Sequence, residues 1–262
     1  MTASPVQRRA NVIGLGLIGG SIALALKGAG WNVSGDDTRE PTVTSALDRG
    51  IIDASGLDVD AEITFVAVPV RSTTDEVERA LAETTGTVTD VGSVKTPVCR
   101  SVESPRFIGG HPMAGSEFDG IDAAQADLFQ SAVWVLTPLE GSDDATFAQV
   151  NGIISSFGAD VVALSPERHD ELVAVVSHVP HLAAATLMGL ASTRSEEHAA
   201  LLRLAAGGFR DMTRVASGQP GIWIDICAEN KTAITSALGE LIAGLSNVRD
   251  LIATDDHETL RS

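Results

Sequence analysis

A histidine stands directly after a pair of glycines in the segment Gly109–Glu117, which reads GGHPMAGSE. Because an imidazole titrates near neutral pH, His111 is suited to act as a general base. A short apolar run precedes it and Pro112 follows, which predicts a place at the carboxyl end of a strand, where ligand crevices open in α/β sheets. Glu117 is expected to orient the site or to pair with a basic group. On the residues alone, a purely structural role for His111 is the alternative.

A second polar segment, Asp90–Lys95, reads DVGSVK and directly follows another apolar run. At the carboxyl end of a strand, Ser93 and Lys95 would be within reach of a substrate or a cofactor. The alternative, which these residues alone favour, is that Ser93 caps the helix that includes Pro97.

The segment Ser177–His181 reads SHVPH and falls inside a helical pattern. Pro180 has no N–H to donate to the carbonyl four residues earlier, so a kink is expected there. Ser177 and His181 are four residues apart and therefore share one helix face, which indicates a ligand site. The alternative is a kinked helix with surface histidines, among them His178.

The formal charge of the chain is −17, and its only lysines are Lys27, Lys95 and Lys231. Such a surface repels nucleic acid and anionic membranes, so neither is an expected partner. It also repels anionic cofactors and carboxylate substrates, which must then be held by local cations. The candidates are Lys95, Arg210 and Arg214.

Arg210 and Arg214 lie four residues apart in the segment GGFRDMTR. Arginine binds carboxylates through two parallel hydrogen bonds, so this pair is a candidate substrate anchor. A surface salt-bridge cluster with Asp211 is the alternative.

The element that must hold a cofactor comes first in the chain, where a short apolar run leads into GLGLIGGS. Its G-x-G-x-x-G spacing indicates a dinucleotide site, with one glycine for the turn, one for close approach of the pyrophosphate and one for helix packing. A second predicted strand then leads to Asp37. Counted from the last glycine of the motif, Asp37 lies close to the roughly 20 residues expected for an acid that holds the ribose hydroxyls. The predicted cofactor-binding residues are Gly14, Gly16, Leu17, Ile18, Gly19 and Asp37.

Strand and helix patterns alternate up to Leu164, after which only helical patterns follow. This order predicts an α/β fold, a doubly wound parallel sheet of Rossmann type, followed by an all-α dimerisation domain. The predicted boundaries are 1–165 for the dinucleotide-binding domain and 166–262 for the helical domain. Helices are expected over residues 166–188, 196–206, 208–216 and 221–253. The last of these carries an apolar stripe, which favours packing against a second subunit in a homodimer. The alternative is that the stripe only covers the core of its own chain.

The composition is that of a soluble globular protein of 262 residues, with 44% hydrophobic residues and two cysteines. The start lacks the apolar core of a secretory signal, no apolar run is expected to reach the length of a membrane span, and the cysteines cannot form a disulfide framework. These features favour a cytoplasmic enzyme. The six histidines are scattered, which predicts no metal site. The acidic, lysine-poor surface also suggests adaptation to a salty cytoplasm, a hypothesis that activity falling steadily from low to molar salt would contradict.

The motifs GLGLIGGS, DVGSVK, GGHPMAGSE, SPERHD, SHVPH, GGFRDMTR and WIDICAENK occur in the order typical of the prephenate/arogenate dehydrogenases of tyrosine biosynthesis. The resemblance covers nearly the whole chain. It implies that a hydride passes to NAD, or to NADP, while the ring carboxylate leaves as CO2 and the ring becomes aromatic.

The resemblance also implies a role for each matching position. His111 would accept the proton of the ring hydroxyl, and Ser93 would orient that hydroxyl and the histidine. Arg214 would bind a substrate carboxylate. The remaining implied positions are Ser177 and His181 beside the substrate, Glu117 as a gating acid, and Trp223 where the helical domain approaches the neighbouring subunit's site.

Several alternatives stay open at this point. Prephenate is the preferred substrate, but no motif decides against arogenate. Asp37 favours NAD because a carboxylate repels a ribose phosphate, whereas Arg39 leaves NADP possible. A β-hydroxy acid dehydrogenase is one alternative; it would need a lysine base in the helical half, where Lys231 is the only lysine. A non-catalytic NAD-binding regulator is another, but it would not need His111, Ser93 and Arg214 together.

Overall fold

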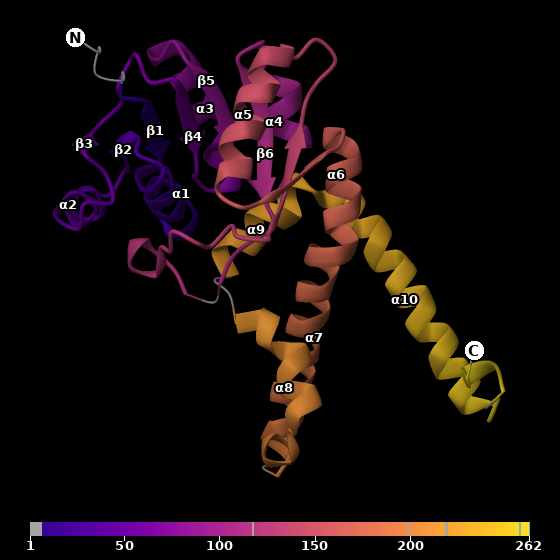
Figure 1. The fold of residues 1–262 in the computed structure, drawn as a ribbon. Coiled ribbons are helices and arrows are strands. Elements are labelled where there is room, and N and C mark those ends of the chain that lie inside the picture. The colour runs from indigo at the N-terminus through magenta and orange to yellow at the C-terminus, as the bar shows by residue number, and fades with distance from the viewer. Residues whose placement is uncertain (1–6, 117, 199, 218–219, 257, 262) are drawn as a thin grey trace, which may run out of the picture. The chain divides into compact units, whose positions relative to one another are not determined.

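The computed structural model describes residues 7–116, 118–198, 200–217, 220–256 and 258–261. The chain divides into two compact units, the first up to His169 and including Pro220–Asp225, the second from Asp170 onward apart from that segment. The strands all belong to the first unit, and Figure 1 draws the earlier ones in indigo to magenta. The domain boundary predicted at residue 165 stays a prediction.

The first unit is built on an eight-stranded sheet in the order β3-β2-β1-β4-β5-β6-β7-β8 (Figure 1). Strand order changes direction between β1 and β4, and in open α/β sheets ligands bind at the carboxyl ends of the strands beside such a switch. The strands are β1 (Arg9–Ile13), β2 (Asn32–Asp36), β3 (Ala54–Ser55), β4 (Ile63–Val66), β5 (Thr87–Asp90), β6 (Phe107–Pro112), β7 (Val133–Thr137) and β8 (Asp160–Ala163).

The predicted doubly wound parallel sheet is confirmed for β1 to β6, but β7 pairs antiparallel with β6, from Gly109↔Thr137 to Pro112↔Trp134. A parallel connection needs a crossover of a dozen or more residues, usually a helix. Between β6 and β7 the described residues form only a short 3-10 turn, Ile121–Ala123, so the chain returns antiparallel. β8 then runs parallel to β7.

Apolar residues fill both faces of the sheet, as expected for strands covered by helices. β4, with the sequence ITFV, is buried at every position. Phe65, Phe129, Trp134 and Phe157 form a cluster of aromatic rings with centroids 4.9–6.4 Å apart. The covering helices are α1 (Leu17–Gly28), α2 (Glu40–Asp48), α3 (Thr73–Glu83), α4 (Thr96–Ser101) and α5 (Asp144–Ser156).

After β8 the described chain is helical. The elements are α6 (Pro166–Val173), a π-helical turn (Ala174–His178), α7 (Val179–Glu197), α8 (Gly207–Arg214), α9 (Pro220–Glu229) and α10 (Lys231–Ala253). The π turn ends two residues before Pro180, which breaks the α-helical hydrogen bonds of the preceding turn.

Two of the helices predicted from the sequence are wrong. The helix expected over residues 196–206 is instead the end of α7 followed by a 3-10 turn, Leu202–Leu204. The helix expected over residues 221–253 is two helices, because Asn230 leaves helical geometry and its side-chain amide donates to the carbonyl of Asp170 at 2.9 Å.

One helical stretch, Pro166–Glu196, is long and apolar enough to cross a membrane by length and composition. This corrects the prediction that no apolar run reaches that length. A single such helix is weak evidence for a membrane span, because core helices of soluble proteins meet the same length and composition criterion. In this structure 33% of its apolar window is buried.

Candidate active site

The glycine-rich loop joins β1 to α1, and each of its three motif glycines has a different environment. Gly14 has φ +86°, a conformation that favours glycine, and its N–H donates to the carbonyl of Asp36 at 2.7 Å. A Cβ on Gly19 would lie 1.8 Å from the carbonyl oxygen of Gly14, so the helix packs directly on the turn. A Cβ on Gly16 would meet no atom within 4 Å, which leaves open space at the start of α1.

Asp37 lies against this loop. Its Oδ2 accepts a hydrogen bond from the N–H of Leu15 at 2.9 Å, and its Oδ1 accepts one from the N–H of Arg39 at 2.9 Å. The guanidinium of Arg39 is 3.5 Å from the same carboxylate and mostly exposed.

The open space at Gly16, the N-terminus of α1 and the carboxylate beside the loop fit a dinucleotide. The N–H groups that begin α1 suit a pyrophosphate, and Asp37 suits ribose hydroxyls. Leu17 and Ile18, also predicted to bind the cofactor, form the first turn of α1.

His111 lies at the end of β6 and is almost fully buried. Its Nδ1 is 2.8 Å from Nε2 of His169, on α6, and the two rings meet edge to face at 74°. Only one hydrogen fits between the two nitrogens, so one ring donates and the other accepts. His169 is fully buried and holds the His111 ring by its Nδ1 side.

The two glycines before His111 are required by close packing. A Cβ on Gly109 would lie 2.4 Å from Oγ1 of Thr137, and a Cβ on Gly110 would lie 2.7 Å from the carbonyl oxygen of Asp90. β6 therefore runs between its neighbours with no room for side chains immediately before the histidine.

Lys95 does not present a cation to a ligand, which corrects the prediction made for it. Its side chain is fully buried, and its ammonium pairs with the carboxylate of Asp90, which is also fully buried. Ser93 is half-buried in the loop that follows β5. The alternative that Ser93 caps α4 is wrong, because Lys95 occupies the N-cap position.

The histidines of the SHVPH segment belong to the second unit and are buried, so the alternative of surface histidines is wrong. Nδ1 of His181 is 2.8 Å from the carbonyl oxygen of Val215, which can only accept, so this nitrogen carries the hydrogen. Burial lowers the pKa of His181 from its ordinary value, and the hydrogen bond to Val215 opposes this. The neutral ring then carries its lone pair on Nε2.

His178 takes the opposite tautomer. The side-chain amide nitrogen of Asn230 lies 2.9 Å from the carbonyl of Asp170 and 3.3 Å from Nδ1 of His178. Because the carbonyl fixes the amide as a donor, Nδ1 of His178 accepts, and the hydrogen of the neutral ring is on Nε2. Ser177, predicted to contact a ligand, lies in the π turn and is half-buried.

The other predicted residues lie on separate elements. Arg210 and Arg214 are exposed on α8 in the second unit, and Trp223 lies on α9 within the first unit. Glu117 falls outside the described residues. Among the residues that the structure describes, no group of three or more metal-ligating side chains gathers, and the absence of a metal stays a prediction.

Sequence reasoning missed His169 and Asp90 as parts of the site. His169 lies in the motif SPERHD, but nothing in its local pattern separates it from a surface histidine on a helix. Asp90 carries a better signal, since a carboxylate that ends an otherwise apolar strand is normally paired.

Comparison with known proteins identifies both halves of the chain. Residues 22–163 match the family described as prephenate dehydrogenase, nucleotide-binding domain, and residues 165–262 match prephenate dehydrogenase, dimerization domain. The chain is 37% identical to a prephenate dehydrogenase of Bacillus subtilis, over 94% of this chain and 71% of that protein.

Solved structures are similar over nearly the whole chain. One is prephenate dehydrogenase from A. aeolicus in complex with hydroxyphenyl propionate and NAD+, with a TM-score of 0.91 and 30% identity over 99% of this chain and 95% of that one. Another is Synechocystis arogenate dehydrogenase, with a TM-score of 0.81 and 31% identity over 97% and 95%. The chain therefore belongs to the prephenate dehydrogenase family.

Proposed function

We propose that this protein catalyses the NAD-dependent oxidative decarboxylation of prephenate to 4-hydroxyphenylpyruvate and CO2. The observation that carries the proposal is the buried contact between His111 and His169, in the same unit as the glycine-rich loop. This arrangement holds a base at the carboxyl edge of a nucleotide-binding sheet. Bound NAD supplies the hydride acceptor.

His111 accepts the proton of the ring hydroxyl at Nε2. For this the neutral ring must carry its hydrogen on Nδ1, which then donates to Nε2 of His169 at 2.8 Å. With its Nε2 as the acceptor, His169 stabilises this tautomer and fixes the ring plane, and after proton transfer it still accepts from the His111 imidazolium. The hydroxyl carbon loses a hydride, and the ring carboxylate then leaves as CO2. The electrons of the broken C–C bond complete the aromatic ring and pass to the ring oxygen, which takes the proton back from His111.

The remaining site residues bind and orient the substrate. Ser93 orients the hydroxyl, and Arg214 binds a carboxylate against the repulsion of the acidic surface. Ser177 and His181 lie beside the substrate, and the lowered pKa of His181 favours its neutral form there. Glu117 gates the site, and Trp223 lies where the site meets a second subunit.

The protein forms a homodimer through its C-terminal helices, and the domain boundary lies at residues 165 and 166. Support for the dimer comes from α10, where large apolar side chains remain exposed within the single chain (Ile242, Leu245, Val248 and Ile252). Replacing Leu245 with Asp should shift the mass measured by light scattering from dimer to monomer. The protein acts in the cytoplasm and binds neither nucleic acid nor membrane.

A spectrophotometric assay tests the activity. NAD and NADP are each offered with prephenate and with arogenate, at low and at high salt, and the fastest reduction is expected with NAD and prephenate. A faster reaction with arogenate would indicate an arogenate dehydrogenase instead. The structure of Synechocystis arogenate dehydrogenase is similar to this one over nearly the whole chain. Tight NAD binding without turnover of either substrate would indicate a regulator instead.

Replacing Arg214 with Ala should mainly raise the KM for prephenate, by about tenfold or more, because a charge-assisted contact is lost. An unchanged KM would contradict its assignment.

A further inference from the structure

We propose that Asp90 is a positioning residue that holds the Ser93 loop and the His111 strand in one fixed register. The inference rests on the proposed function, which assigns the chemistry to these two segments. Asp90 itself is fully buried and does not touch the substrate.

The two carboxylate oxygens of Asp90 serve different segments. Oδ2 accepts a hydrogen bond from the N–H of Gly92 at 2.8 Å, and Oδ1 accepts one from the N–H of Gly110 at 3.2 Å. Ser93 directly follows Gly92, and His111 directly follows Gly110. One rigid side chain therefore fixes the backbone immediately before each catalytic residue.

This contact begins where the regular sheet ends. The pairing of β5 with β6 stops at Thr89↔Ile108, and beyond it the carboxylate of Asp90 accepts from the backbone of β6. The side chain thus extends the hydrogen-bonded contact between the two strands up to the residue before the histidine.

Lys95 completes the arrangement. A buried carboxylate without a partner is strongly unfavourable, and the ammonium of Lys95 pairs with Oδ2 inside the protein. Lys95 also begins the turn into α4, so the ion pair closes the loop that carries Ser93.

The glycines of both motifs leave space around this carboxylate. A Cβ on Gly92 would lie 3.0 Å from Oδ2 of Asp90, and a Cβ on Gly109 would lie 3.6 Å from Oδ1. Gly92 therefore packs closely on the Asp90 carboxylate, whereas Gly109 is constrained mainly by Thr137 and Cys99.

The test replaces Asp90 with Asn, whose single acceptor oxygen cannot serve both N–H groups. We expect kcat to fall about 100-fold, as for a small misplacement of catalytic groups, while the Kd for NAD and the KM for prephenate change less than about threefold. A kcat per folded molecule within about threefold of wild type would overturn the proposal.

If Asp90→Asn does not fold, the double variant Asp90→Asn/Lys95→Met replaces the ion pair by a neutral pair of similar shape, which proteins often tolerate. The same fall in kcat is expected, and the same threshold overturns the proposal. The matched control is Lys27→Met/Asp53→Asn, which neutralises another ion pair of the first unit, and its kcat should equal that of wild type.

Amide hydrogen exchange separates this inference from the proposed function. The amides of Gly92 and Gly110 should exchange at least about tenfold faster in Asp90→Asn than in wild type, and not in the control. If wild type fails to turn over prephenate, the proposed function fails while this readout still decides the inference. Unchanged exchange at both glycines would overturn it.

Discussion

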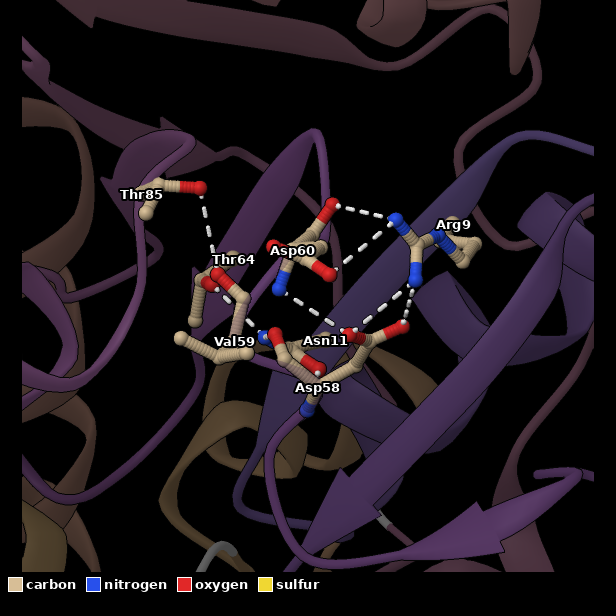
Figure 2. A network of polar contacts seen from close by, with 7 residues as sticks. All are labelled: Arg9, Asn11, Asp58, Val59, Asp60, Thr64 and Thr85. Atoms are coloured by element: carbon tan, nitrogen blue, oxygen red, sulfur yellow. Dashed lines mark hydrogen bonds and ion pairs between the residues drawn. The ribbon is translucent and has the colours of Figure 1, made fainter.

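The two edges of the sheet in the first unit are both rich in polar contacts, but they use them differently. At the amino edge, Arg9 and Asn11 each bond to Asp58, and Arg9 also bonds to the carbonyl of Asp60 (Figure 2). At the carboxyl edge, glycines keep side chains out, Asp37 accepts from a backbone N–H, His111 meets a second histidine, and Asp90 pairs with Lys95.

The amino-edge network closes the loop between β3 and β4. The side chain of Asn11 donates to the carbonyl of Asp58 at 3.0 Å and accepts from its N–H at 2.9 Å, while Arg9 pairs with the Asp58 carboxylate at 3.1 Å (Figure 2). Thr85 donates to the carbonyl of Val59 at 3.2 Å, which fastens the same loop from the β5 side (Figure 2). Loop backbone that would otherwise lack partners is satisfied by side chains.

The difference shows how the same polar chemistry serves stability at one edge and function at the other. At the amino edge the polar groups bond to neighbouring protein groups. Removing one of these side chains should therefore lower the free energy of unfolding and leave turnover intact. At the carboxyl edge, a Cβ on Gly16 would meet no protein atom within 4 Å, and the paired histidines place an imidazole near the end of β6. Changes there should alter binding or turnover more than stability.

The largest effect is expected for His111→Asn. The variant loses the general base and should lower kcat by about 100-fold or more, because general-base catalysis typically contributes that much. The Kd for NAD, measured by fluorescence, should stay close to that of wild type. Turnover within tenfold of wild type would remove His111 from the role of base and weaken the distinction between the two edges.

The second effect concerns Gly16→Ala. A Cβ there meets no protein atom within 4 Å, and the φ of −80° suits alanine, so the Tm should not fall. The same methyl group would occupy the space predicted for the pyrophosphate and should weaken NAD binding by about tenfold, or about 1.4 kcal/mol.

Gly152→Ala, on α5, is the matched control, since its Cβ also meets nothing within 4 Å. Calorimetry should find wild-type NAD affinity in this variant. Equal NAD affinity in Gly16→Ala and Gly152→Ala would show that the cofactor does not bind at the glycine loop.

Much of the sheet could be predicted from the sequence because its signals are local. The glycine spacing determines the turn at Gly14, and the apolar run of β4 predicts a buried strand. The reversal at β7 was missed because it depends on the absence of a crossover helix between β6 and β7, and irregular segments carry weak patterns. The break at Asn230 was missed because its cause is a hydrogen bond to Asp170, 60 residues earlier.

The site was only partly predictable for the same reason. His111 has a local signal in its glycine pair, whereas His169 is 58 residues away and becomes visible only when α6 is folded. Lys95 was misassigned because an isolated lysine near a strand end has the same pattern whether it faces a ligand or a buried carboxylate. Its partner Asp90 decides between the two.

A smaller effect, on stability alone, is expected for Asn11→Ala at the amino edge. The fully buried side chain bonds to Asp58 and to Thr64, so its removal leaves buried partners unsatisfied and should cost about 2 kcal/mol. The Tm should fall by about 4–8 °C, while kcat per folded molecule stays at the wild-type value. A fall in kcat larger than the loss of folded protein would show that the two edges are coupled.

The smallest effect concerns the pH dependence of stability at Asp53, which accepts hydrogen bonds from Lys27 and from the N–H of Val33 near the start of β2. Burial works to raise the pKa of Asp53, but these two hydrogen bonds outweigh it and hold the pKa below its ordinary value. Because the folded pKa is the lower one, Asp53 stabilises the fold above the unfolded pKa and loses this contribution as the pH falls through the folded pKa. The difference in urea midpoint between wild type and Asp53→Asn should therefore be present above about pH 5 and shrink toward pH 3, with a size below about 1 kcal/mol. A difference that does not change with pH would mean that the carboxylate acts through shape rather than charge.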